Sequence, residues 1–161
     1  MQPADLPAPA EVMPHSGAMV LLATIERHDR GTTACSANVD QCALFTAADG
    51  SLPCWVGIEL MAQCIAVHAG LMGRAQGQPP RIGFLLGARR IRFHQPRYEA
   101  GQSVEVTATH VWGGELGMVA FDCSIVARSS GVLLADARLN CFLPREGELR
   151  EGELLGGMRE A

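Results

Sequence analysis

The 161-residue chain contains no lysine, and all 13 of its basic side chains are arginines. This absence excludes a lysine Schiff base or any other lysine nucleophile. The formal net charge is −4, which disfavours nucleic-acid binding, because that function usually requires a basic balance or a basic stripe. Composition therefore favours a globular domain that binds neither DNA nor RNA.

The six cysteines lack the spacing of a metal site or a redox motif. No two of them form a C-x-x-C pair, and no cluster of histidine and cysteine has zinc-ligand spacing. Because most of them lie in apolar runs, we expect free thiols that pack as small hydrophobic side chains. The N-terminus does not read as a signal peptide, so we expect a cytoplasmic protein. Because the cysteines and histidines lack metal-ligand spacing, we expect no bound metal.

A single long apolar stretch, residues 52–72, is interrupted by Glu59, Gln63 and His68. These polar residues favour a buried helix of a globular domain over a membrane span. The helical period extends over residues 52–71. Strand-like alternation with glycine-rich breaks predicts six strands, at residues 18–26, 32–39, 82–93, 103–112, 117–127 and 132–142.

The predicted element order is two strands, one helix and four strands. A helix that is apolar nearly all round must be covered on most sides. A curled antiparallel sheet wrapped around one long central helix would cover it, which is the hot-dog fold of the α+β class. We expect this domain to span residues 11–143, with a loose lead-in at residues 1–10 and a polar tail at residues 144–161.

Glu59 and Gln63 are four residues apart and so share one face of the predicted helix. A buried carboxylate must be paired, neutralised or used in chemistry. Two interpretations are open: Glu59 is a hydrogen-bonded interface residue, or it is an acid beside the helix N-terminus, where the dipole favours a thioester oxygen. His68 lies about half a turn away and points to the opposite face.

Three segments together resemble the beta-hydroxyacyl-acyl carrier protein dehydratase family. They are MPHSGAMVLLATI at residues 13–25, LPCWVGIELMAQ at residues 52–63 and GFLLGARRIRFHQP at residues 83–96. The Glu-Leu-Met-Ala-Gln run is similar to the segment that carries the family's catalytic carboxylate, which would be Glu59. The Trp-Val-Gly-x-Glu pattern is most similar to predicted dehydratases of aryl-polyene-type lipid clusters.

The resemblance implies a hot-dog fold that pairs its sheets edge to edge, in a homodimer or in a heterodimer with a related subunit. It implies removal of water from a 3-hydroxyacyl thioester to give the 2-enoyl thioester, in fatty-acid or aryl-polyene-like lipid biosynthesis. The substrate would arrive on acyl carrier protein, whose phosphopantetheine replaces any cofactor of the enzyme's own.

The sequence departs from the family at the catalytic base. In the family a histidine of a Gly-His-Phe-Pro segment precedes the carboxylate, but the corresponding position here is near Phe45, in a segment without histidine. His15 is the first choice as the replacement base, because its loop precedes the first strand and can reach the site. His68 is the second choice, and Asp49 is a weaker acidic option.

Other candidates surround the start of the helix. We expect Cys54 and Trp55 to shape the helix entrance and the acyl pocket, and Gln63 to contact substrate beside Glu59. Gly57 either permits close approach of the thioester or only relieves packing.

Three arginines, Arg89, Arg90 and Arg92, lie close together on a predicted strand. They either attract an acidic carrier protein or form a solvated strand face.

Two functions compete with dehydration. A carboxylate on the central helix can also support a hot-dog acyl thioesterase, by activating water or by direct attack. The missing histidine equally allows a non-catalytic subunit that pairs with an active dehydratase.

Overall fold

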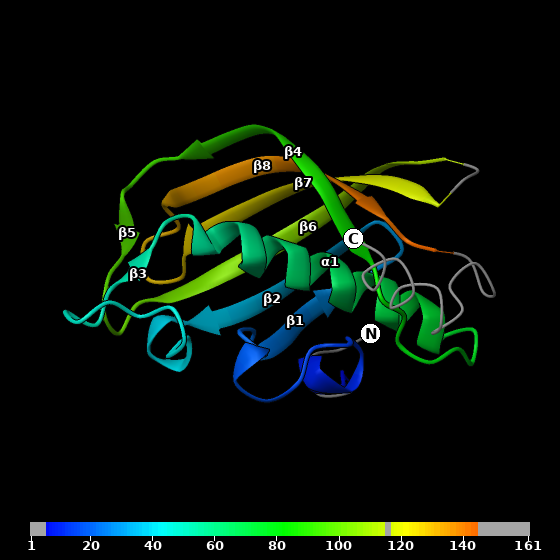
Figure 1. Cartoon of the computed structure of the whole chain (residues 1–161), viewed down its shortest axis with the longest axis horizontal. Coiled ribbons are helices and arrows are strands. Elements are labelled where there is room, and N and C mark those ends of the chain that lie inside the picture. Colours follow the sequence, from blue (N-terminus) through cyan, green and yellow to red (C-terminus); the bar gives the residue numbers. More distant parts are fainter. Residues whose placement is uncertain (1–5, 115–116, 145–161) are drawn as a thin grey trace, which may run out of the picture.

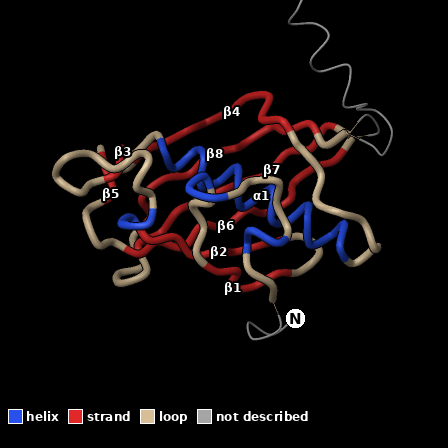
Figure 2. The backbone as a smooth tube through the Cα atoms, turned by 60° about the horizontal axis from the view of Figure 1, so that its bottom comes forward, coloured by secondary structure: helices blue, strands red, loops and turns tan. Residues whose placement is uncertain are grey.

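The computed structural model describes residues 6–114 and 117–144, which form one curled antiparallel sheet around one long helix (Figure 1). The six main strands lie in the order β1-β2-β6-β7-β8-β4. Figure 2 shows helix α1 (Val56–Arg74) lying across the concave face of this sheet. The strands are β1 (Thr24–His28), β2 (Thr32–Asn38), β4 (Phe84–Phe93), β6 (Ser103–Gly113), β7 (Met118–Ala127) and β8 (Leu133–Phe142). This arrangement confirms the predicted hot-dog fold.

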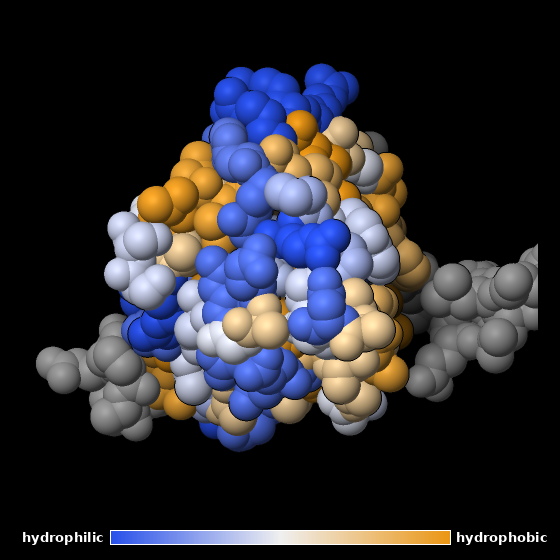
Figure 3. Space-filling view, turned by 90° about the vertical axis from the view of Figure 1, so that its left-hand side faces the viewer, coloured by the Kyte–Doolittle hydropathy of each residue, from blue (hydrophilic) through white to orange (hydrophobic). Residues whose placement is uncertain are grey.

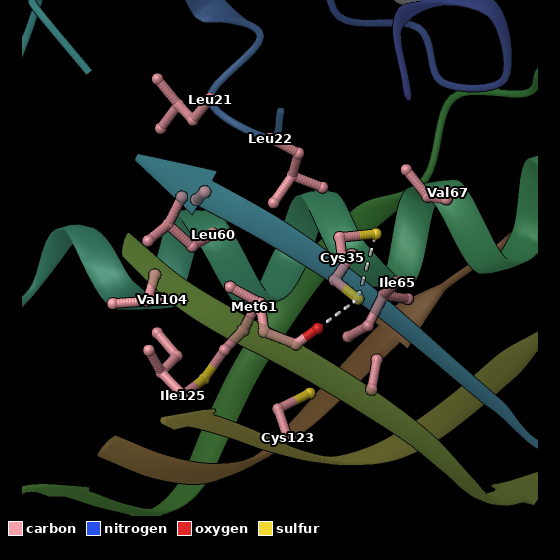
Figure 4. Packing of buried hydrophobic residues seen from close by; sticks show 14 of the residues in the cluster. Leu21, Leu22, Cys35, Leu60, Met61, Ile65, Val67, Val104, Cys123 and Ile125 are labelled. Atoms are coloured by element: carbon pink, nitrogen blue, oxygen red, sulfur yellow. Dashed lines mark hydrogen bonds between the residues drawn. The ribbon is translucent and has the colours of Figure 1, made fainter. Parts of the chain in front are cut away.

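The hydrophobic core lies between α1 and the inward side chains of the sheet. Figure 4 shows Leu60 and Met61 of the helix facing Val104 of β6 and Ile125 of β7. On the strands, buried residues alternate with partly exposed ones, as expected for a sheet with one covered face. The helix is buried on most sides, which explains its nearly continuous apolar sequence.

The predicted strand at residues 18–26 is only partly correct. Residues Gly17–Met19 form the short 3-10 helix η3, and β1 begins only at Thr24. The reason is that the backbone at Met19 and Leu21 bonds to the side chain of Gln63 rather than to a neighbouring strand. Those backbone groups are therefore satisfied without a strand ladder.

The helix begins four residues later than predicted and ends three residues later. Leu52 and Pro53 form a short strand, β3 (Leu52–Pro53), which pairs with β5 (Arg97–Tyr98). The sequence did not predict this pair. At the other end, the amide of Gln78 donates to the Gly73 carbonyl and closes the helix.

Two helix glycines mark places where another segment comes too close for a side chain. A Cβ at Gly57 would lie 2.2 Å from the Tyr98 hydroxyl oxygen, and one at Gly70 would lie 1.6 Å from the Val12 carbonyl oxygen. Glycine in a helix interior is unfavourable by about 1 kcal/mol relative to alanine. The contacts that these glycines permit offset this cost in helix stability. Gly70 lets the N-terminal segment lie directly on α1.

The expected lead-in belongs partly to the fold. Residues 1–5 and the predicted tail beyond residue 144 lie outside the described residues. Within residues 6–10, however, Pro9 is buried in the 3-10 helix η2 (Pro9–Glu11), and Leu6 packs against the core. The remaining 3-10 helix, η4 (Val39–Gln41), follows β2.

Helix α1 is long and apolar enough to cross a bilayer by length and composition alone, but 67% of its apolar window is buried inside the fold. This burial fits the expected core helix. The end of the molecule that carries β3 and β5 is largely hydrophilic, with hydrophobic residues gathered toward its margins (Figure 3).

All six cysteines are free, as predicted, and five of them are buried. The Cys64 sulfur lies 3.5 Å from the Thr33 carbonyl oxygen, 3.4 Å from the Val106 carbonyl oxygen and 3.9 Å from the Cys35 sulfur, so its single S–H hydrogen has three acceptors within reach. These thiols fill space in the core.

A buried histidine lies between the helix and the sheet. Nδ1 of His68 is 2.9 Å from the Thr33 hydroxyl, which is also 2.8 Å from Nδ1 of His28. Because the hydroxyl has a single hydrogen, at most one ring accepts from Thr33, and at least one of the two Nδ1 atoms donates to it. Burial, with a smaller effect of the nearby His28 and His110, lowers the pKa of His68 from 6.5 to about 4, and Asp29 opposes the shift.

Stability should therefore fall in mild acid. Between pH 6.5 and 4 the unfolded chain binds a proton at His68 that the folded chain does not, so the free energy of unfolding decreases as pH falls. The loss reaches about 3 kcal/mol near pH 4 for a shift of this size. Urea denaturation from pH 7.5 to 4 measures it. His68→Asn should show a shallower dependence, and an unchanged slope in that variant would contradict the assignment to His68.

Candidate active site

One face of α1 forms the floor of a cavity of about 180 Å³. Glu59, Ala62, Ala66 and Ala69 recur at the helical period, so their side chains follow one stripe along the helix. The small alanines leave space that larger side chains would fill. Ile65 of the helix also lines the cavity. The opposite walls come from the N-terminal segment, from residues before and within β4, and from the end of β8 and the residue after it. These wall residues are Pro14, His15, Arg81, Gly83, Phe84, Leu85, Cys141 and Leu143.

Glu59 and His15 meet at this cavity. Nε2 of His15 lies 3.6 Å from Oε1 of Glu59, and their side chains are 29% and 35% exposed. Glu59 lies in the first turn of α1, where the helix dipole favours negative charge. An imidazole and a carboxyl group in contact can share and exchange one proton. The structure thus brings together the two residues that the sequence singled out as acid and base.

Gln63 connects the two elements that carry this pair. Its amide nitrogen donates to Oε1 of Glu59 at 2.9 Å and to the Met19 carbonyl at 2.7 Å, and its oxygen accepts from the Leu21 amide at 3.0 Å. The side chain is fully buried. Gln63 therefore lies beneath Glu59, outside the cavity lining, and holds the carboxyl group and the segment after His15 in fixed positions.

The N-terminal segment follows the helix toward Glu59. Val12 contacts the helix at Gly70, where the absent Cβ admits the Val12 backbone. Three residues later, His15 reaches Glu59 near the other end of the same helix face. The second ring nitrogen of His15, Nδ1, is buried and has no hydrogen-bond partner among residues 6–114 and 117–144. The Nε2 atom is thus the nitrogen that faces the acid.

The two other base candidates lie outside the cavity lining. His68 is buried against Thr33, on the side of α1 that faces the sheet. Asp49 accepts hydrogen bonds from Ser51 and pairs with Arg97 at 2.7 Å, and these contacts lower the pKa of its carboxyl group. Within the described part of the chain, no group of three histidine, cysteine, aspartate or glutamate side chains is arranged to hold a metal ion.

The remaining candidates lie near the helix start, outside the lining of this cavity. Trp55 is exposed and packs edge-on against Phe45, with ring centroids 6.0 Å apart. Trp55 precedes Glu59 by one helical turn on the same face, so it lies in line with the cavity floor. The Cys54 carbonyl accepts a 3.5 Å bond from Tyr98, and Gly57 makes room for that tyrosine, which agrees with the packing interpretation.

Sequence reasoning missed most of the cavity lining. The alanines at positions 62 and 69 lie on the Glu59 face, and their helical spacing was the signal that could have found them. Cys141 and Leu143 come from the end of β8, and only the strand order places them next to the start of β4.

Replacing Gln63 with leucine should destabilise the fold. Leucine leaves the buried Leu21 amide without a partner, at a cost of about 1–3 kcal/mol, and removes the part-buried bond to the Met19 carbonyl as well. Chemical denaturation should show a loss of about 2–4 kcal/mol. Gln41→Leu, at an exposed amide after β2, is the control and should change stability by less than about 0.5 kcal/mol. Equal effects of the two variants would show that the Gln63 bonds are dispensable.

Known proteins resemble this chain in sequence and fold. A search of curated proteins finds no match. Among solved structures, the dehydratase heterocomplex ApeI:P from Xenorhabdus doucetiae matches with a TM-score of 0.84 and 26% identity, over 96% of this chain and 99% of that chain. The Escherichia coli PaaI protein from the phenylacetic acid degradation operon matches with a TM-score of 0.57 and 19% identity, over 73% and 80% of the two chains.

A hypothetical thioesterase with coenzyme A from Streptococcus pneumoniae matches with a TM-score of 0.59 and 15% identity, over 76% of this chain and 85% of that chain. Like the PaaI match, it shows the shared fold alone. The family profile is more specific, because ApeP-like, described as ApeP dehydratase, matches residues 7–151. The dehydratase resemblance seen in the sequence is thereby confirmed, and this chain belongs to the ApeP-like dehydratase family.

Proposed function

We propose that this protein removes water from a 3-hydroxyacyl thioester and that His15 and Glu59 carry out the proton transfers. The observation that supports this most directly is the 3.6 Å contact between the His15 imidazole and the Glu59 carboxyl group at the end of an apolar cavity. Dehydration needs one group to take a proton and one to give a proton, and this pair supplies both.

In the proposed reaction His15 is the base and Glu59 the acid. Nε2 of His15 takes the proton from C2, the C2–H electron pair forms the C2=C3 double bond, and the C3–O bond breaks. Glu59 gives its proton to the departing hydroxyl, which leaves as water. The products are the 2-enoyl thioester, an imidazolium and a carboxylate.

The contact between the two groups then resets the pair. Once the product leaves, the proton taken by His15 can pass to Glu59, because the two side chains are adjacent in the empty site. Gln63 donates to Oε1 of Glu59, the same oxygen that faces Nε2 of His15, and so orients the carboxyl group toward the imidazole. The reaction needs no redox step and no further cofactor.

The cavity suits the tail of an acyl chain. Its floor runs from Glu59 to Ala69, ten residues or about 15 Å along the helix axis. The walls at Ile65, Phe84 and Leu143 are apolar. With the thioester at Glu59, an acyl tail would lie over the alanine stripe and bury its hydrocarbon surface.

The substrate and the assembly belong to the same proposal. The matched ApeI:P structure is a heterocomplex, which favours pairing of this chain with a second hot-dog subunit. Strand β4 is at the edge of the sheet and is largely exposed, so its unpaired side can receive a strand of another subunit. The acyl chain would be delivered by acyl carrier protein, with family membership pointing to aryl-polyene-like lipids.

Glu59→Gln and His15→Gln should each lower kcat for a 3-hydroxyacyl thioester by roughly 10²–10⁴-fold, because each removes one proton-transfer group. The double variant should be little worse than either single variant, since the two groups act as a unit. Formation of the enoyl product, measured by mass spectrometry, tests this.

His94→Gln is a matched control, because His94 pairs with Asp136 outside the cavity. Full turnover by Glu59→Gln would refute the proposed acid. Release of free thiol from saturated acyl thioesters at the same rate would instead indicate a thioesterase. Turnover that appears only with a canonical hot-dog partner, and survives both substitutions, would identify a non-catalytic subunit.

Filling the cavity should shorten the accepted acyl chain. Ala66→Phe places a ring over the floor beyond Glu59, so kcat/KM for long acyl chains should drop at least tenfold while the shortest substrate is retained. Ala75→Phe, exposed at the end of α1 and outside this cavity, serves as the control. Uniform loss across chain lengths would show that the tail does not occupy this space.

A further inference from the structure

The cavity on α1 carries polar side chains at its two ends and none between them. His15 and Glu59 lie at one end, and Arg81 also belongs to the lining. The remaining lining residues are alanine, glycine, proline, cysteine and larger apolar residues, whose side chains contain no nitrogen or oxygen. The proposed function gives roles to His15 and Glu59 but not to Arg81.

Strand pairing places Arg81 at the end of the cavity that is remote from Glu59. Strand β3 lies just before α1 in the chain, β5 lies just after β4, and these two short strands pair with each other. The end of β4 is therefore next to the start of α1, and β4 runs back along the helix (Figure 1). Arg81 comes three residues before Phe84, the first residue of β4. It consequently lies near Ala69, at the far end of the floor that begins at Glu59.

The guanidinium of Arg81 is available to a ligand. Arg81 is exposed, and within the described part of the chain no carboxylate lies within ion-pair distance of it. A guanidinium is a rigid fork of N–H donors that binds oxygen acceptors, and carboxylates most strongly. Because Arg81 precedes β4, it also lies outside the strand ladder that a second subunit would extend.

The far end of the cavity differs from a pocket that closes around a methyl group. A hydrocarbon end is stabilised by apolar walls that exclude water. Here Arg81 and Gly83 are both exposed, so this end of the cavity is in contact with water. A polar group at the end of the tail would keep its hydrogen bonds in this position, while the preceding carbons remain over the alanines of the floor.

We propose that Arg81 selects acyl chains whose far end carries an oxygen acceptor, an inference that rests on the proposed function. With the thioester at Glu59, the hydrocarbon part of the tail would cover the apolar floor. A terminal carboxylate or hydroxyl oxygen would then accept hydrogen bonds from the guanidinium. The chain must span the floor from Glu59 to Ala69, about 15 Å, before its end meets Arg81. Arg81 is thus a specificity-determining residue that does not touch the reacting atoms.

The phosphate of the thioester arm is another source of oxygen acceptors, but the arm fits the floor less well. For its phosphate to reach Arg81, the arm would have to lie along the floor in place of the tail. A phosphopantetheine arm contains amide groups, whose burial without hydrogen-bond partners is unfavourable. The side chains between Glu59 and Arg81 offer no such partners, and the backbone of α1 is bonded within the helix.

The test uses N-acetylcysteamine thioesters of 3-hydroxyacyl chains that differ only at the far end. For chains that span the floor, kcat/KM of the wild type should be roughly fivefold higher with a terminal carboxylate or hydroxyl than with a methyl group, as expected for an exposed charged contact. In Arg81→Met this preference should disappear or reverse, because a carboxylate keeps its desolvation cost and loses its partner. Arg81→Lys should retain part of it. Chains too short to reach Arg81 should show no preference.

Arg30→Met is the matched control, because Arg30 is an exposed arginine outside this cavity. This variant changes the net charge equally and should leave every value unchanged. Equal kcat/KM for the different chain ends in the wild type, or a preference that survives in Arg81→Met, would overturn the proposal. So would an Arg81 effect that appears with phosphopantetheine thioesters of methyl-terminated chains and is absent with N-acetylcysteamine thioesters, because it would assign the arginine to the phosphate of the arm.

A binding measurement separates this inference from the proposed function. Titration calorimetry with saturated N-acetylcysteamine thioesters that lack the 3-hydroxyl group needs no turnover. The wild type should bind the carboxylate-terminated chain more tightly than the methyl-terminated chain, and Arg81→Met should not. If this difference is found but no enoyl product forms, the proposed function fails and the binding role of Arg81 stands. If methyl-terminated and carboxylate-terminated chains are dehydrated and bound equally well, the proposed function stands and the role of Arg81 fails.

Discussion

The buried amide of Gln63 is the constraint on which the site depends. It donates to Glu59 and to the Met19 carbonyl and accepts from the Leu21 amide, so one side chain links the central helix to the segment that precedes β1. A buried amide without these partners would be strongly unfavourable, which fixes the arrangement. As a result the carboxyl group has one orientation, and the nearby His15 segment is held along the same helix face. The glycine at position 70 completes this constraint by admitting the Val12 backbone.

This arrangement changes where the proposed acid and base come from. The sequence resemblance implied a base from a Gly-His-Phe-Pro segment in the loop before the helix. Here the loop near Phe45 packs against Trp55, and the imidazole that faces Glu59 comes from the N-terminal segment of the same chain. Each chain therefore carries both groups. In the proposed assembly the partner subunit would instead cover the exposed β4 edge beside the cavity wall.

Much of the fold could be predicted from sequence, because period and apolarity reflect burial directly. The helix and the strands after residue 82 were found within a few residues. The strand predicted at residues 18–26 was too long. The first part of this segment is apolar and buried like a strand, but it forms a loop, because its backbone bonds to the Gln63 side chain and not to a neighbouring strand. The β3–β5 pair depends on contacts between distant residues, which a local pattern does not record. Likewise, the helix face that carries Glu59 was predictable, but its neighbours from β4 and β8 were not.

Strands β4 and β8 contribute residues to a hollow on each face of the sheet. Since successive side chains alternate between faces, one pair of strands lines an apolar cavity on the inside and an apolar-basic groove on the outside. The inner positions carry small and apolar residues, which suit the proposed acyl tail, and the outer positions carry arginines. Because the inward and outward side chains occupy alternate positions of the strands, the residue types on one face do not restrict those on the other. In the proposed assembly the edge position of β4 adds a third role, because a strand of another subunit can pair with its backbone while the side chains keep both faces.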